Sequence, residues 1–97
     1  MMTVEANRYA AALERLAEIN AEALALAEVL DHFAAVLRGA RPDPDGPPLE
    51  ALPSAWRVRR LLDRRFEAAG QVEDEWARLP PEAREALPSP DDLLARG

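Results

Sequence analysis

Few residues of this chain could do chemistry, and the first is a histidine that stands near carboxylates. His32 is the single histidine, and Glu28 precedes it by one helical turn. Such a pair can share a metal ion if Glu22, Asp31 or further copies of the chain complete the site. The alternative is an exposed histidine paired with Glu28. We predict no metal and keep Glu28 and His32 as the candidate ligands of a metal-binding bundle built by symmetry.

A cluster of arginines is the second candidate. Residues 57–65 contain five of them, although the net charge of the chain is −6. Such a cluster can bind phosphate or an acidic partner, or it can be the solvated face of a helix. Residues 54–70 carry +3 between segments of −2 and −4, which disfavours nucleic acid as the ligand. The predicted partner or anion surface consists of Trp56, Arg57, Arg60 and Arg64.

Other catalytic groups are missing or have simpler explanations. The chain has no cysteine and no glycine-rich phosphate loop, and Ser54 and Ser89 are explained as helix caps. The acidic run 73–75 looks like a solvated surface, and the sequence "DPDG" at 43–46 is typical of a turn. We therefore predict that the protein is not an enzyme and needs no cofactor.

The elements that would position these residues are helices. Residues 4–38 lack proline and glycine, and five prolines fall within the predicted connector 39–53. A second helix is expected over 54–79, capped by Ser54 and passing through Gly70. The tail 80–97 is predicted to form two short helices, the first beginning at Pro81 and the second capped by Ser89, with Leu87, Leu93 and Leu94 to bury. The fold class is thus all-α, a single domain built on an antiparallel two-helix hairpin.

The apolar residues of both long helices recur at alternating steps of three and four. On the second helix this seam runs through Val58, Leu62, Arg65 and Trp76, with Phe66 on the same apolar face as Leu62. Pairing residues whose numbers sum to 92 places Trp76 level with Leu16. In this register the first helix overhangs the second, so the tail is expected to cover Tyr9.

The apolar stripe of the first helix is wider than one partner helix can cover, which predicts dimerisation to a four-helix bundle. Asn20 is a polar member of the seam and either pairs with Asn20 of a second copy or reaches water. The predicted oligomer interface consists of Leu13, Leu16, Ile19, Asn20, Leu26, Leu30 and Phe33.

Composition places the chain among acidic, alanine- and leucine-rich helical proteins. The abundance of alanine, arginine and proline, without lysine, suggests a GC-rich bacterium or its phage. No signal peptide or membrane span is expected, which makes the cytoplasm the expected location. We expect a small non-enzymatic interaction protein: an adaptor, assembly factor or accessory subunit. The alternatives are an acidic antitoxin-like or nucleic-acid-binding regulator that uses the arginines 57–65, and the metal-binding bundle.

Overall fold

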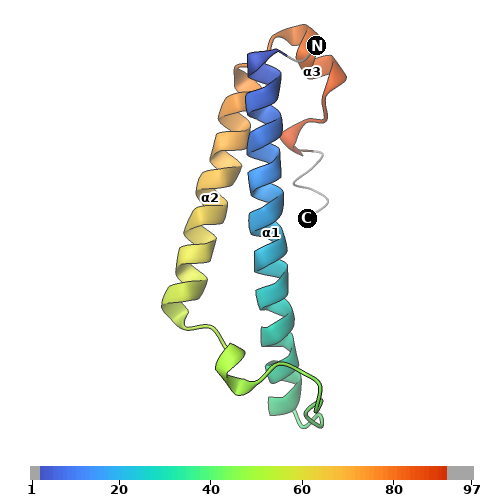
Figure 1. Cartoon of the computed structure of the whole chain (residues 1–97), viewed down its shortest axis with the longest axis vertical. Helices are drawn as coiled ribbons and strands as arrows, with labels where there is room; N and C mark the ends of the chain where they lie inside the picture. Colours follow the sequence, from blue (N-terminus) through green and yellow to red (C-terminus); the bar gives the residue numbers. More distant parts are fainter. Residues whose placement is uncertain (1–2, 92–97) are drawn as a thin grey trace.

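The computed structural model describes residues 3–91, and over this range the chain is an elongated helical hairpin (Figure 1). Its helices are α1 (Val4–Leu37), the 3₁₀ turn η1 (Leu49–Ala51), α2 (Ala55–Ala77) and α3 (Pro81–Ala86). The molecule measures 54 × 23 × 20 Å, and α1 and α2 run antiparallel along its length. The all-α hairpin is confirmed, whereas the four-helix bundle stays a prediction.

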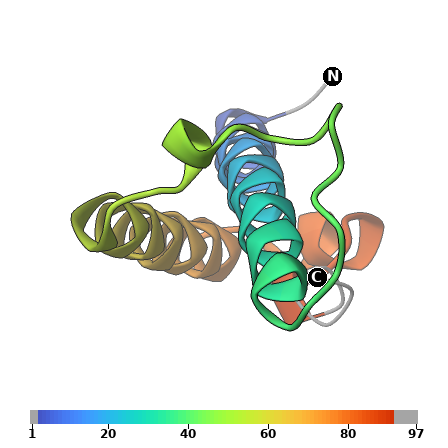
Figure 2. The same ribbon diagram turned by 90° about the horizontal axis from the view of Figure 1, so that it is seen from below.

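Local signals set the ends of both long helices. The hydroxyl of Thr3 accepts a hydrogen bond from the amide of Ala6 at 3.1 Å, and Ser54 caps α2 through the amide of Arg57 at the same distance. Gly39 has φ = 107°, a left-handed conformation that suits glycine and ends α1. Gly70 lies inside an unbroken α2, as predicted. The connector contains the helical turn η1 and passes the end of α1 to reach α2 (Figure 2).

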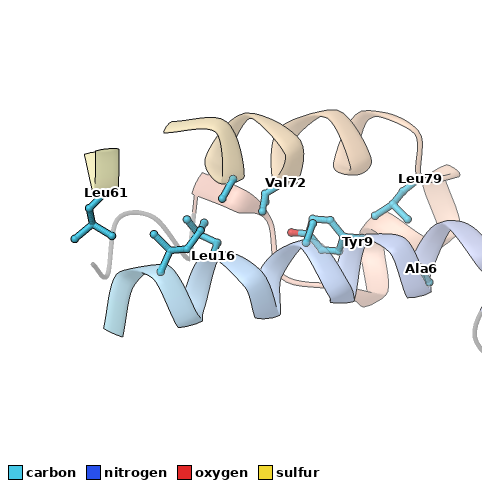
Figure 3. Packing of buried hydrophobic residues seen from close by; sticks show 9 residues of the cluster. Ala6, Tyr9, Leu16, Leu61, Val72 and Leu79 are labelled. Atoms are coloured by element: carbon cyan, nitrogen blue, oxygen red, sulfur yellow. The ribbon is translucent and has the colours of Figure 1, made fainter. Parts of the chain in front are cut away.

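The buried core occupies one end of the hairpin. From α1 it takes Ala6, Tyr9, Ala12, Leu16 and Ile19, and from the rest of the chain Leu61, Ala68, Val72 and Leu79. Figure 3 shows Leu16 on α1 and Val72 on α2 pointing toward each other between the two helices. No described residue of α1 beyond Ile19 is buried, and α2 diverges from α1 toward the connector (Figure 1). We call the tail-covered part the closed end and the connector part the open end.

The predicted helix register was wrong by about one heptad. The rings of Tyr9 and Trp76 lie 5.3 Å apart, and Arg64 pairs with Glu22 at 3.4 Å. These contacts place Trp76 level with Tyr9 instead of Leu16. Both registers keep apolar residues facing each other, because a seam with a seven-residue period looks alike after a shift of seven.

The predicted apolar face of α2 was wrong at Leu62 and Phe66, whereas Trp76 packs against the core as expected. Leu61 is 6% exposed and lies in the core, whereas Leu62 is 56% and Phe66 82% exposed. The predicted seam also contained Arg65, which is exposed in the structure. The helix turns Leu61, Ala68 and Glu75 toward α1, and each of them stands one residue before a member of the predicted seam. The rotation leaves Leu62 and Phe66 outside.

The tail docks on its own hairpin and covers Tyr9, although Tyr9 lies level with Trp76 on α2 and not beyond the end of that helix, as the predicted register had it. The hydroxyl of Tyr9 donates a hydrogen bond to the carbonyl oxygen of Pro88 at 2.6 Å. Arg84 donates to the carbonyl oxygens of Trp76 at 3.2 Å and Ala77 at 2.7 Å, which satisfies the last turn of α2. Leu87 also packs against the core. Pro81 begins α3, as predicted.

The second predicted tail helix falls mostly outside the described residues. Ser89 is half-buried, and residues 90–91 are helical. Asp92, Leu93 and Leu94, which were expected to complete the cap and the apolar contact, lie outside the described residues.

Tyr9 gives the fold a testable dependence on alkaline pH. Burial raises the pKa of its hydroxyl above the ordinary value of 10.0, so the folded chain holds this proton more tightly than the unfolded chain. The contribution of the neutral Tyr9 hydroxyl to the free energy of unfolding is complete below about pH 10. It is lost as the pH rises through the pKa of the folded state. Because the chain has one tyrosine and neither lysine nor cysteine, no other side chain titrates in this range.

We expect the free energy of unfolding, measured by urea titration, to fall in the wild type as the pH rises above about 10. Tyr9→Phe should lose about 0.5–1.5 kcal/mol at neutral pH, because Pro88 loses its donor, and should then be insensitive to this pH range. An equal alkaline loss in both proteins would contradict the buried position of the hydroxyl.

Candidate contact surface

Exposed apolar side chains gather at the open end. Apart from Val4, every large apolar residue that is exposed in residues 3–91 lies between residues 24 and 66. They are Leu24, Leu30, Leu37, Leu49, Leu52, Trp56, Leu62 and Phe66. Scattered apolar residues on a surface need no explanation, but a concentration at one end of a small protein is typical of an interaction site.

The structure divides the predicted oligomer interface between the core and the surface. Leu16 and Ile19 are 5% and 2% exposed, so the chain itself already uses them. Leu13 and Leu26 are partly buried against the same core. Leu30 is 41% exposed, and Phe33 is half-buried with its ring edge-on to His32. A partner meeting the single chain would therefore find Leu30 and not Leu16 or Ile19.

Asn20 lies at the boundary between the two ends. Its Oδ1 atom is buried and has no hydrogen-bond partner among the described residues. The residue as a whole is only half-buried, so Asn20 still meets water in the single chain although its Oδ1 atom does not. Pairing with Asn20 of a second copy remains a prediction. It requires the side chains that cover Oδ1 in the single chain to move aside.

The predicted arginine surface separates into two parts. Arg64 bridges the hairpin by pairing with Glu22 at 3.4 Å, with both side chains nearly half exposed. Such an exposed pair contributes less than about 1 kcal/mol. Arg60 instead lies over the ring of Trp56, 5.3 Å from its centroid, and Trp56 is 67% exposed. Arg57 is exposed, and no carboxylate in residues 3–91 lies within ion-pair distance of it.

Trp56 and Arg60 belong to an open hollow of about 310 Å³, lined also by Arg59 and Asp63. We call these four residues the arginine corner. A cation above an exposed indole is stabilised by the negative face of the ring. The corner can therefore present a flat aromatic surface and guanidinium donors to an incoming acidic group.

The metal candidates Glu28 and His32 belong to no group of three or more ligands among the described residues, and a site completed by further copies stays a prediction. No group of three or more His, Asp and Glu side chains able to hold an ion occurs in the part of the chain that the structure describes. Glu22 pairs with Arg64, and His32 lies against the connector, where a Cβ added at Gly46 would come within 3.0 Å of its Cε1 atom.

The connector turn at Asp43–Gly46 is confirmed by the hydrogen bond from the amide of Asp45 to Oδ1 of Asp43 at 2.9 Å.

Sequence reasoning missed Glu75. It was assigned to a solvated acidic run, but it is 7% exposed and lines a hollow of about 330 Å³ with Arg8, Ala11, Ala12, Arg15 and Gln71. Its Oε1 accepts from Arg78 at 3.0 Å, while Oε2 is buried without a partner among residues 3–91. The sequence signal for its burial was its spacing. Glu75 stands three residues after Val72 and four before Leu79, which places it on the same helical face as these two buried residues.

Comparisons of the chain with protein-family models, curated proteins and solved structures found no match. Among the described residues, no helix is both long and apolar enough to cross a membrane.

Proposed function

We propose that this protein is a small non-enzymatic interaction protein that acts through contact surfaces at its open end, including contact with its own copies. The observation that carries the proposal is the uneven distribution of apolar side chains. The closed end is sealed by the tail, whereas Leu37 is 87% and Trp56 67% exposed at the open end. Covering such side chains is worth about 25 cal/mol per Å² removed from water, which favours association.

The arginine corner favours an acidic group on the partner. Tryptophan and arginine are among the residue types that most often dominate the binding energy at protein interfaces. Nucleic acid is the second candidate, because an exposed indole with neighbouring guanidinium groups can stack bases and bind phosphate. The acidic surroundings of the corner favour protein, since a phosphate backbone would also meet the carboxylates of the flanking segments.

Capture of a partner with matched variants tests the proposal. The tagged full chain is compared with Leu37→Ser and Trp56→Ser, which alter exposed open-end residues, and with Val4→Ser, which alters a residue 61% exposed at the closed end. We expect a partner that binds the wild type and Val4→Ser alike and binds each open-end variant about tenfold more weakly. The binding should be reproduced with the two purified proteins.

Two results would count against this function. One is a set of partners that all bind the four proteins equally, and the other is the absence of any reproducible partner. A nucleic-acid mobility shift at two salt concentrations distinguishes the second candidate, because phosphate binding weakens steeply with salt.

A further inference from the structure

The side of α2 that faces away from α1 carries a continuous exposed stripe. It starts at the first residue of the helix and ends at the last, with steps of four, three, four, four, three and four residues, which keep one face of a helix. Every member is exposed, and α2 has no other element beside it on this side in Figures 1 and 2. The outer stripe consists of Ala55, Arg59, Leu62, Phe66, Gly70, Glu73 and Ala77.

The order of residues in the outer stripe suits pairing with itself. Phe66 is the midpoint of α2, and the steps on either side of it mirror each other. If two α2 helices lie antiparallel about a two-fold axis through Phe66, Arg59 of each meets Glu73 of the other, and Leu62 meets Gly70. Both ends of the stripe are alanines, which allow the two backbones to approach closely. An interface of this kind is the same patch on both copies.

The charges of α2 suit this pairing, as they also suit the antiparallel α1, whose residues 20–37 hold three carboxylates and no arginine. Residues 55–66 hold five arginines and one aspartate, whereas residues 67–77 hold four carboxylates and no arginine. This is the reverse of what the helix dipole favours, since anions stabilise the first turn of a helix and cations the last. Arg64 reaches Glu22 on α1, but Arg59 and Glu73 have no ion pair among residues 3–91. An antiparallel second α2 places opposite charges together along the helix.

Gly70 supplies a second, independent observation. A glycine inside a helix costs about 1 kcal/mol relative to alanine. Its φ is not positive, and a Cβ added there meets nothing within 4 Å, so the single chain gives no reason for glycine. Four residues away, Phe66 is 82% exposed. A small residue beside a large exposed one forms the depression that Leu62 of a second copy would fill.

We propose that the chain forms a two-fold symmetric dimer through the outer stripe of α2, with Phe66 at the axis. This interface differs from the one predicted on α1, part of which is buried inside the chain. The inference rests on the proposed function, because it assigns Leu62 and Phe66, two of its exposed apolar residues, to contact with a second copy. It leaves Leu37 and Trp56 for other partners.

Sedimentation velocity over a concentration series tests the dimer when the wild type is compared with charge-reversal variants of Arg59 and Glu73. The wild type should pass from 10.7 kDa to twice that mass as concentration rises. Arg59→Glu should raise the dimer dissociation constant about tenfold or more, because it replaces two attractive pairs by two repulsive ones. Adding Glu73→Arg should restore the wild-type constant. The two positions lie four turns apart on one helix, so this rescue requires a second copy.

Arg57→Glu is the matched control, because it makes the same charge change on another side of α2. It should leave the dissociation constant within about twofold of wild type. Three results would overturn the inference: a wild type that stays at 10.7 kDa throughout, a response to Arg57→Glu equal to that of Arg59→Glu, or a double variant that fails to recover. None of these results affects binding through Leu37 and Trp56, which the capture experiment tests.

Discussion

Replacing Leu16 by alanine is expected to lower the free energy of unfolding by about 2–5 kcal/mol. Leu16 is 5% exposed between the two helices, and its loss leaves a cavity that the closed end cannot fill by collapse. A domain of this size is stabilised by only about 5–15 kcal/mol, so the variant should lose a large part of its stability. The measurement is urea denaturation followed by the helical circular dichroism signal.

Leu37→Ala is the control for this prediction. Leu37 lies three heptads after Leu16 in the same column of the seam, but it is 87% exposed. Its replacement should change the free energy of unfolding by less than about 0.5 kcal/mol, measured at low protein concentration. Equal losses for the two variants would mean that the seam is packed along its whole length, contrary to the structure.

Replacing Glu75 by leucine is expected to stabilise the protein by about 1–3 kcal/mol. One carboxylate oxygen of Glu75 is buried without a hydrogen bond among residues 3–91, and leucine removes that cost while filling the same space. The arginine left behind, Arg78, has a side chain that is 63% exposed, so water can replace its lost partner. Urea titration of the two proteins at neutral pH measures the difference.

Glu67→Leu controls for the change in helix propensity and net charge, because Glu67 is an exposed glutamate of the same helix. It should shift stability by less than about 0.5 kcal/mol. If Glu75→Leu instead destabilises the protein, the carboxylate of Glu75 has a favourable partner that the structure does not show.

Sequence reasoning located the elements well because their limits are set locally. Proline, a serine cap and a left-handed glycine act on the backbone next to them, and the ends of α1 and α2 fall within two residues of the predicted limits. The contact of the tail with Tyr9 was expected from sequence but for the wrong reason, because Tyr9 lies level with Trp76 on α2 and not beyond the end of that helix.

The register and the rotation of α2 could not be fixed in the same way. A seven-residue repeat gives nearly the same pattern after a shift of seven, so only particular contacts, such as Tyr9 with Trp76, distinguish the two registers. The rotation was missed because Glu75 was assigned to the solvated acidic run, although it is buried on the same face as Leu61 and Ala68.

The sequence predicted which residues form the candidate contact surface, but not which contacts each of them makes. The sequence identified Trp56 and the arginines as a possible contact surface, and Trp56 is exposed with Arg60 over its ring. It could not show that Arg64 is held by Glu22 on the neighbouring helix, because that contact depends on the register. The outer stripe escaped notice because Leu62 and Phe66 were assigned to the core.

Hydrogen exchange along α1 tests most directly the claim that one end of this hairpin is closed and the other is open for contact. In dilute protein, we expect amides of residues 6–19 to be strongly protected and those of residues 24–37 to exchange markedly faster, because no residue of that half is buried. Uniform protection along α1 in dilute protein would contradict the account, since it would mean that the chain closes its open end without a partner.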